Sequence, residues 1–419
     1  QQHLFIRLPG LWFIQAGNWI YAREKALPPA ASSNPSRLAR QTDNGARHYL
    51  KVTKWAGDHL FGLSAARFDD SLNYSERIVA NDSVINSSGI RTSNTFLGVS
   101  HRWSASQSFS LESGADLERQ QAASGSFAGQ VSELRSALYL LARLNLGGLS
   151  GAAGIRQEFN GTNTPWPLVS LHASHPMGDR LFLRASLSNK YRLPNLNEKY
   201  WKPGGNPDLL PETGFGGDLG LTWNGLQDNR FTPHASINLF AQEVNNWIQW
   251  LPAGTYWSPL NIREVRCQGM EAEWGSTLRL SDTQLKTTIL YAYTESLDMS
   301  RENISERLER QLAYVPLHTF RILAAVNHKP FDGSASFGYH GKRHTTDVHD
   351  QYLDLHAYYL ADIQFGYQLQ FKQSGLAIRL KINNLFNASF QTIRGYPSPG
   401  RSFSLMLIYS MQKANNQNQ

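Results

Sequence analysis

The sequence predicts an all-β fold, a transmembrane antiparallel β-barrel, and three features of the chain lead to this prediction. Apolar and polar residues alternate with period two, the alternating segments are long, and short links between them alternate with long ones. The clearest segment, YLADIQFGYQLQF at 359–371, places apolar and aromatic residues on one face and mainly amides on the other. Such alternation is typical of a strand whose two faces meet different surroundings.

Segment length favours a membrane barrel over a soluble sandwich. Several alternating segments run to ten or more residues, whereas soluble strands average about five or six and a tilted membrane-spanning strand needs about nine to eleven. Because every backbone group must be paired in lipid, such strands have to close into a barrel. The expected lipid-facing residues include Ile363, Phe365, Leu380 and Leu407, and the expected lumen-facing residues include Asp362, Gln364, Arg379 and Lys381.

The composition removes several other classes of protein. The 419 residues are only 17% charged and carry a formal net charge of +7, with no run of Lys and Arg. Scattered charge without a recognition motif argues against nucleic-acid binding. A single cysteine excludes a disulfide framework and a cysteine metal cluster. No stretch of eighteen apolar residues is present, which excludes a transmembrane helix.

The alternating segments, taken in order from about residue 11, number about eighteen. Short links join them at 56–58, 103–107, 146–151, 176–179, 225–229, 329–333 and 371–375. Long links lie near 72–87, 190–213, 243–264, 297–312 and 342–354. Short turns at one end and long loops at the other are typical of outer-membrane barrels, with the short turns on the periplasmic side. Trp and Tyr near strand ends, as at Trp55, Trp103, Trp223 and Tyr409, fit an interfacial aromatic girdle.

Three ordered motifs carry a more specific signal. The segment SNKYRLPNLNEKYWKPGGNPDLLPETG at 188–214 combines Arg192, Pro194, Asn206, Pro207, Pro211 and Glu212 in a loop too rich in Pro and Gly for regular pairing. The segment WSPLNIREVRCQGMEAEW at 257–274 contains Gly269 and Glu271. The C-terminal segment INNLFNASFQTIRGYPSPGRSFSLMLIY at 382–409 contains Gly400 and Arg401 before a final aromatic-ended strand.

Together these motifs resemble those of TonB-dependent outer-membrane receptors of the siderophore and cobalamin type. The resemblance implies a barrel of about 22 strands that fills its lumen with an N-terminal plug and imports a scarce nutrient. It places the segment NPDLLPE at 206–212 in an extracellular loop region. It also implies a bacterial outer-membrane location, outer-membrane lipid as surroundings, and no cofactor.

The chain departs from the family pattern at its beginning and end. We expect an N-terminal remnant at 1–10, a barrel at 11–410 and a polar tail at 411–419, without a plug and with about four strands fewer than the family number. Coupling to the TonB complex would then depend on the missing plug. If strands are missing, 11–24 and 402–409 either pair with each other in a narrower barrel or leave an unstable open arc.

Aromatic residues in the expected outer loops are the candidate ligand contacts. They are Tyr200, Trp201, Trp247, Trp250, Tyr256 and Trp257, with Lys202 beside them. Flat aromatic side chains suit a large, partly apolar ligand such as a ferric siderophore or a corrinoid, although Trp and Tyr suit lipid-interface anchoring equally well.

The segment YHGKRHTTDVHD at 339–350 adds His344 and His349 as candidate contacts. With His340, Asp347 and Asp350, these residues could also supply ligands for a metal. Spacing within a loop is weak evidence, and we expect no metal.

The expected function is TonB-dependent uptake of a ferric siderophore or cobalamin. The alternative is a passive porin-like channel, because a barrel of this size leaves an aqueous pore when it is unplugged. No nucleophile motif accompanies the acids and histidines of the outer loops, so we expect no enzyme activity.

Overall fold

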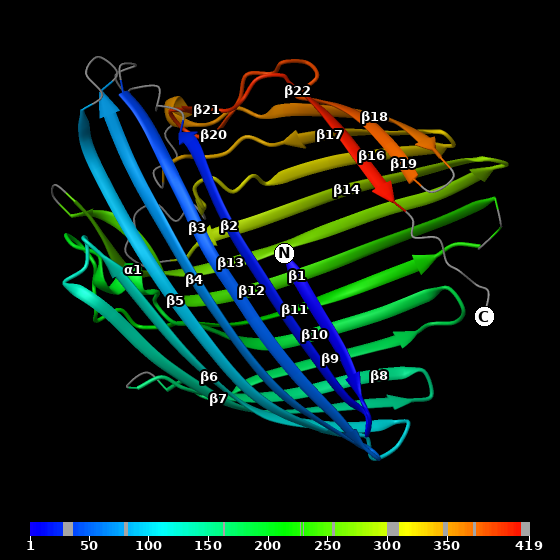
Figure 1. Ribbon diagram of the computed structural model, residues 1–419, viewed down its shortest axis with the longest axis horizontal. Coiled ribbons are helices and arrows are strands. Elements are labelled where there is room, and N and C mark those ends of the chain that lie inside the picture. The colour runs from blue at the N-terminus through cyan, green and yellow to red at the C-terminus, as the bar shows by residue number, and fades with distance from the viewer. Residues whose placement is uncertain are drawn as a thin grey trace.

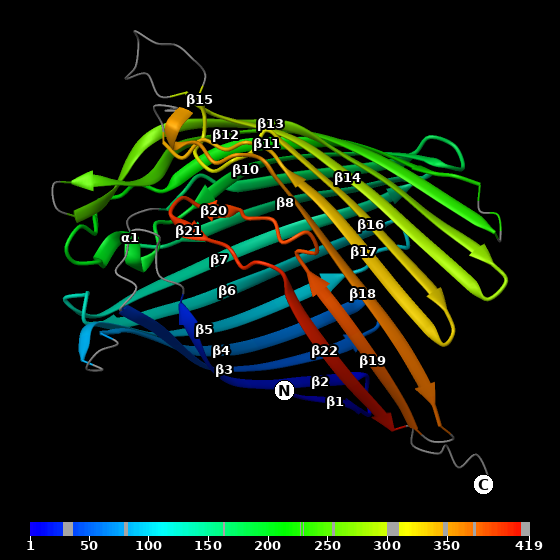
Figure 2. The ribbon, with the colours of Figure 1, turned by 90° about the horizontal axis from the view of Figure 1, so that it is seen from above.

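The computed structural model describes residues 1–27, 37–78, 83–161, 164–226, 228, 230–253, 256–299, 310–346, 351–371 and 374–411. In these residues the chain forms one antiparallel sheet of 20 strands and a separate two-stranded sheet. The large sheet curls round a central space, and α1 and the β20–β21 pair lie on its concave side (Figures 1 and 2). The predicted all-β antiparallel fold is confirmed.

The strands before the first motif are long and consecutive. They are β1 (Gln2–Leu8), β2 (Trp12–Leu27), β3 (Arg37–Ala56), β4 (His59–Ile78), β5 (Val84–Trp103), β6 (Phe109–Ser124), β7 (Gly129–Leu146), β8 (Leu149–Phe159), β9 (Leu168–Pro176) and β10 (Leu181–Arg192). Each pairs antiparallel with the next.

The remaining elements begin with the short helix α1 (Leu196–Tyr200). They continue with β11 (Glu212–Asn224), β12 (Phe231–Ala253), β13 (Tyr256–Leu280), β14 (Thr283–Asp298), β15 (Arg310–Gln311), β16 (His318–His328), β17 (Phe331–His340), η1 (Gln351–Leu353), β18 (Tyr358–Gln370), β19 (Ser374–Asn383), β20 (Gln391–Ile393), β21 (Tyr396–Pro397) and β22 (Ser402–Met411). No helix in the described ranges is both long and apolar enough to cross a membrane.

Burial confirms the predicted alternation. The four residues expected to face lipid are exposed: Ile363 by 38%, Phe365 by 56%, Leu380 by 46% and Leu407 by 63%. Strand register places the four on one face, because Phe365 pairs with Leu380 and Leu407 pairs with Ile378, two residues before Leu380. Asp362 instead bonds to Ser336 and Asn384 on the concave side, where the loops lie. A register slip of one residue would exchange the two faces, so the pattern fixes the register.

The expected count and limits of the strands need three corrections. The main sheet has 20 strands, because β1 and the two-residue β15 were not expected. The strand β1 lies within 1–10, which were expected to precede the barrel. The long link expected at 243–264 is mostly strand, because β12 and β13 continue through it beyond a bulge at Asn246, whose φ of 57° is left-handed.

Of the two arrangements expected for 11–24 and 402–409, direct pairing is wrong. Both edges of β2 are occupied, one by β1 and the other by β3. The strand β22 pairs with β19 from Ser402 to Met411. The C-terminal tail expected from residue 411 begins within β22, and 412–419 lie outside the described residues.

All seven predicted short links fall between consecutive strands of the sheet. They gather at the end of the sheet opposite α1, and each predicted girdle residue lies within a few residues of one of them or of the end of β22 (Figure 1). Trp55, Trp103 and Trp223 are each about 40% exposed, and Tyr409 is 63% exposed. The long connections, and the functional candidates within them, therefore share the other rim.

Candidate functional site

The helix α1 fixes the start of the motif loop on the concave side of the sheet. Asn195 caps the helix: its side chain accepts a hydrogen bond from the Glu198 amide at 2.9 Å, and the Glu198 carboxylate accepts one from the Asn195 amide at 2.8 Å. This reciprocal capping box satisfies two amides that a five-residue helix cannot satisfy internally. Pro194, just before the cap, is fully buried.

An ion network ties this helix to the strands on either side of the loop. The Arg192 guanidinium donates two hydrogen bonds of 2.6 Å to the two carboxylate oxygens of Glu212, and another of 3.2 Å to Glu198. The Glu212 side chain is 8% exposed. One of its oxygens also accepts a 2.8 Å bond from the Ile248 amide of β12. Arg192 and Glu212 thus connect β10, α1, β11 and the β12–β13 hairpin.

Asparagine side chains join the second half of the loop to the same hairpin. Asn261 donates to the Leu210 carbonyl at 2.9 Å and to the Asn246 carbonyl at 2.8 Å, and it accepts from the Leu210 amide at 2.7 Å. The Asn206 side chain donates to the Pro259 carbonyl at 3.3 Å. Side-chain amides here replace the ladder bonds that a Pro-rich loop cannot make.

Close packing at Gly204 brings the aromatic segments together. A Cβ on Gly204 would lie 2.1 Å from the Trp257 carbonyl oxygen and 3.1 Å from the Tyr256 ring, and its φ of +117° also favours glycine. The Ser258 hydroxyl donates to the Gly204 carbonyl at 2.7 Å. The motif loop and the tip of the β12–β13 hairpin are therefore in direct contact.

A second hairpin, β6–β7, also contacts the helix and the residues that follow it. Lys199 pairs with Glu133 of β7 at 2.7 Å, and both side chains are largely buried. The Lys202 amide donates to the Ser126 carbonyl at 2.7 Å, and Trp201 meets Phe127 edge to face at 6.4 Å. We call the unit formed by 194–211 with its contacts to the β6–β7 and β12–β13 hairpins the rim platform.

The predicted aromatic contacts lie on or beside the rim platform, and they differ in how far they are exposed. Trp257 and Tyr256 are 58% and 42% exposed. Tyr200, Trp201, Trp247 and Trp250 are half-buried. The platform brings Tyr256 and Trp257 to the loop that contains Trp201 and Lys202. Their contact with a ligand stays a prediction.

The motif residues are mainly structural. Gly269 lies where a Cβ would be 2.1 Å from the Tyr293 carbonyl and 2.7 Å from the Phe240 ring. In the C-terminal motif, Asn387 accepts a 2.9 Å bond from the Arg401 amide, and a Cβ on Gly400 would lie 2.7 Å from the same side-chain oxygen. Pro207 is exposed, and the Pro211 carbonyl accepts a 3.5 Å bond from Asn246.

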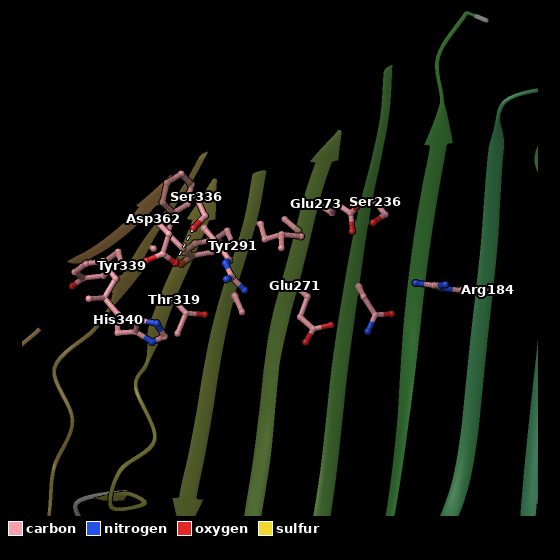
Figure 3. Close-up of a pocket in the computed structure, with 18 residues that line it drawn as sticks. Arg184, Ser236, Glu271, Glu273, Tyr291, Thr319, Ser336, Tyr339, His340 and Asp362 are labelled. Atoms are coloured by element: carbon pink, nitrogen blue, oxygen red, sulfur yellow. Dashed lines mark hydrogen bonds between the residues drawn. The ribbon is translucent and has the colours of Figure 1, made fainter. Parts of the chain in front are cut away.

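Further into the lumen, the wall carries a cavity of about 610 Å³ with both polar and apolar residues in its lining. Glu271 and Glu273 of β13 lie on one side of it, and His340 and Asp362 on the other (Figure 3). Asp362 accepts a 3.3 Å bond from the Ser336 hydroxyl, and Glu273 pairs with His234 at 3.2 Å. The carboxylate of Glu271, predicted only as a motif position, lines this cavity. A solute that passes the rim platform would meet this wall.

In the connection between β17 and β18, which contains the candidate histidines, the described residues form an ion network. Asp354, whose side chain is 1% exposed, pairs with Lys342 at 2.8 Å and with His344 at 2.9 Å. His340 stacks on Tyr358 at 4.8 Å. His349, Asp347 and Asp350 lie outside the described residues. Within the described ranges, no group of three or more His, Cys, Asp or Glu side chains could hold a metal.

We expect the connection between β17 and β18 to loosen at acid pH. Burial alone raises the pKa of Asp354, but bonds from Lys342 and His344 outweigh it and hold the pKa below the usual range. A carboxyl group whose pKa is lower in the folded state than in the unfolded state stabilises the folded loop at pH values above its unfolded-state pKa. This stability is lost as the pH falls through the folded-state pKa. Amide exchange around 342–355, measured at pH 7 and at about pH 3, should show faster loop opening in acid.

The variant Asp354→Asn provides the control for this expectation. It removes the titrating group, so its loop should open readily at both pH values. Equal pH dependence in the two proteins would assign the acid effect to another group.

Sequence reasoning missed the partners that support the platform from β6 and β7. Glu133 belongs to an alternating strand, and Phe127 and Ser126 belong to a turn. About 70 residues separate them from α1, as the Lys199–Glu133 separation of 66 shows. No local pattern marks such a contact.

Comparison with known proteins shows which family the chain matches. A family model described as "TonB dependent receptor-like, beta-barrel" matches residues 15–385. The vitamin B12 transporter BtuB of Vibrio vulnificus strain YJ016 is 24% identical over 74% of this chain and 48% of its own length. BtuB of Photobacterium profundum is 23% identical over 82% of this chain and 54% of its own. The chain thus spans about half the length of these relatives.

Solved structures share the fold. The FrpB iron transporter of Neisseria meningitidis superposes with a TM-score of 0.72 at 13% identity, over 96% of this chain and 70% of its own. The siderophore receptor PirA of Acinetobacter baumannii gives 0.67 at 13% identity, with the same coverage. The copper transporter OprC gives 0.65 at 14% identity, over 94% of this chain and 72% of its own.

Proposed function

Because this chain belongs to the TonB-dependent receptor β-barrel family, an outer-membrane family, we propose that the protein binds a scarce nutrient at its extracellular rim and imports it actively. The proposed ligand is a ferric siderophore or a corrinoid. The observation that supports this most is the rim platform, which holds aromatic side chains on a rigid frame at the mouth of a polar lumen.

Rigidity at the rim is what distinguishes a binding site from a mobile loop. Functional side chains on loops need a rigid scaffold to hold them. The platform supplies one, since its loop is bonded to β10, β12, β13 and the β6–β7 turn. Tyr256 and Trp257 project from the frame with large exposed areas, which suits contact with a planar or macrocyclic ligand.

The binding test uses single aromatic truncations. Trp250→Ala and Trp257→Ala in the full-length protein should each weaken binding of the cognate ligand about tenfold or more, because central aromatic contacts dominate binding energy. The measurement is a titration against ferric siderophores and cobalamin. Trp274→Ala serves as the matched control, since Trp274 lies on the convex face of β13, level with Ala235, and is 39% exposed.

Two negative results would test the ligand class and the aromatic contacts separately. If neither ligand class binds the unaltered protein, the ligand assignment is wrong. If a ligand binds but the rim variants match the Trp274→Ala control, the aromatic residues are not its contacts.

Active import also distinguishes the receptor from a passive porin. Because the outer membrane holds no nucleotide supply, we propose that energy comes from the TonB complex of the inner membrane. Ligand uptake by cells that make the full-length protein should then stop when the proton-motive force is collapsed. Uptake that continues, with steady conductance in planar bilayers, would support the porin.

A further inference from the structure

A second pocket lies on the lumen wall beside the cavity of Figure 3, on the side toward the short turns. Arg321, Ser336 and Asp362 line both of them. The second pocket has a volume of about 350 Å³. Its other polar lining residues are Lys286, Thr288, Ser334, Gln364 and Lys381. We call this second pocket the basic pocket.

Strand register forms the basic pocket by placing small residues between long cationic ones. One row of paired residues crosses five strands and consists of Lys286, Ala325, Ser334, Gln364 and Lys381. Gln364 lies two residues from Asp362 on β18, so the row faces the lumen as Asp362 does. Because Ala325 and Ser334 are short, the middle of the row is a depression with a lysine on either side.

Positive charge is in excess in this pocket. Lys286, Arg321 and Lys381 are all exposed, and none of them forms an ion pair with a carboxylate of the described ranges. Asp362 also lines the pocket, but it accepts its bonds from the Ser336 hydroxyl at 3.3 Å and from the Asn384 amide at 2.9 Å. Three cations thus share the pocket with one carboxylate.

The nearest other charges on this wall are already paired. Arg379, two residues before Lys381 on the same face of β19, lies 3.6 Å from a carboxylate oxygen of Asp332. Glu273 of β13 pairs with His234 at 3.2 Å. Because like charges close together repel each other, a cluster of unpaired cations is stabilised when an anion binds among them.

The chemistry of the lining indicates an anion with several carboxylate groups. A guanidinium fork matches the two oxygen atoms of a carboxylate, and ammonium groups bind the same oxygens as point charges. The three cations stand on three different strands, β14, β16 and β19. Lys286 and Lys381 are four strand spacings apart, about 19 Å along the sheet. A ligand with separate carboxylates can meet all three cations, whereas a compact ion meets fewer.

We propose that the basic pocket is a transit site in the lumen for an anionic metal chelate that carries free carboxylate groups. Arg321, Lys286 and Lys381 bind the carboxylates, and the hydroxyl groups of Ser334 and Thr288 donate further hydrogen bonds. Ion pairs that remain open to water are weak, so the ligand can leave again toward the periplasm. This inference rests on the proposed function, and it narrows the ligand to an anionic ferric chelate rather than a corrinoid.

The test is a calorimetric titration of the full-length protein in zwitterionic detergent with citrate, a tricarboxylate. The double variant Lys286→Gln/Lys381→Gln should bind citrate about tenfold more weakly than the unaltered protein, because charge-assisted contacts are lost. The double variant Lys286→Arg/Lys381→Arg keeps both charges and should retain most of the affinity. The neutral triamide of citrate and inorganic phosphate should both bind more weakly than citrate.

The control Arg7→Gln/Lys51→Gln removes the same charge from the lumen face of β1 and β3, where both residues are exposed. It should bind citrate like the unaltered protein, and circular dichroism confirms that each variant is folded. Equal citrate affinity of the Lys286→Gln/Lys381→Gln variant and the control would overturn the proposal, and so would the absence of citrate binding. Triamide or phosphate that binds as tightly as citrate would overturn the carboxylate assignment.

Failure of the basic pocket can be distinguished from failure of active import. If uptake needs the proton-motive force but the Lys286→Gln/Lys381→Gln variant binds citrate like the control, only the pocket assignment is wrong. If citrate binding depends on the two lysines but uptake continues without the proton-motive force, the pocket binds carboxylates and active import is wrong.

Discussion

Glu212→Ala should loosen the contact of Arg192 and the rim platform with the β12–β13 hairpin while leaving the strands in place. The substitution removes a carboxylate that accepts two bonds from Arg192 and one from the Ile248 amide. The Ile248 amide is then left without a partner in a buried position, and Arg192 keeps only Glu198. We expect the free energy of local opening at Ile248 to fall by about 2–3 kcal/mol, a value reduced because Arg192 can be hydrated.

Hydrogen exchange at the Ile248 amide measures this change directly. A loss of about 2 kcal/mol speeds exchange by roughly 30-fold, since about 1.4 kcal/mol corresponds to a factor of ten. The matched control is Asp208→Ala, which removes a carboxylate from an exposed position in the same loop. If the two variants exchange at the same rate, the ion network does not hold the platform.

The Glu212→Ala variant also connects the platform to function. If the proposed nutrient site needs a fixed frame, ligand affinity should fall in this variant although no aromatic residue has changed. Unchanged affinity would place the binding site elsewhere on the rim or in the lumen.

Leu239→Arg should destabilise the barrel strongly, whereas Asn238→Arg should be tolerated. Leu239 lies on the lipid face of β12 and is 47% exposed, within an apolar row that includes Ile237 and Leu219. An arginine on the lipid face near the middle of the bilayer costs about 2–4 kcal/mol. Asn238 faces the lumen opposite Glu271, so an arginine there meets water and a carboxylate.

Denaturant unfolding of the two variants in lipid vesicles measures the difference. The unfolding midpoint of Leu239→Arg should fall well below that of the unaltered protein, and that of Asn238→Arg should stay near it. The reverse order would mean that the register of β12 is shifted by one residue, because such a shift exchanges the two faces.

Local patterns in the sequence were sufficient to predict the membrane-spanning sheet. Residues 361–371 alternate, and β18 occupies Tyr358–Gln370 with the predicted faces. Period two is a property of each strand by itself, so it can be read without knowing the neighbours. The same reading failed at β1 and β15. The first contains Arg7 and ends at Leu8, just before Pro9, and the second has only two residues, too few to show a period.

In the loop region, prediction from the sequence failed for a different reason. Sequence predicted a long loop at 243–264, but β12 and β13 continue as a hairpin to Ala253 and from Tyr256. The motif loop and the start of β11 stabilise this extension through Asn206 and Glu212, which bond to hairpin atoms. Asn261 of the hairpin bonds in turn to Leu210 of the motif loop. Such support cannot be deduced from the hairpin sequence alone, because it comes from side chains 36 to 53 residues away.

Sequence patterns were enough to predict the all-β class, the two faces of the long strands, the end of the barrel with the short turns, and the family motifs. These depend on local periodicity, turn chemistry and short ordered residue patterns. Only the tertiary structure shows that Arg192, Glu212 and Gly204 build a platform and that Glu133 and Phe127 support it. The physical reason is that pairing between strands brings residues far apart in the chain into contact, and the energy of ion pairs and packing depends on that proximity.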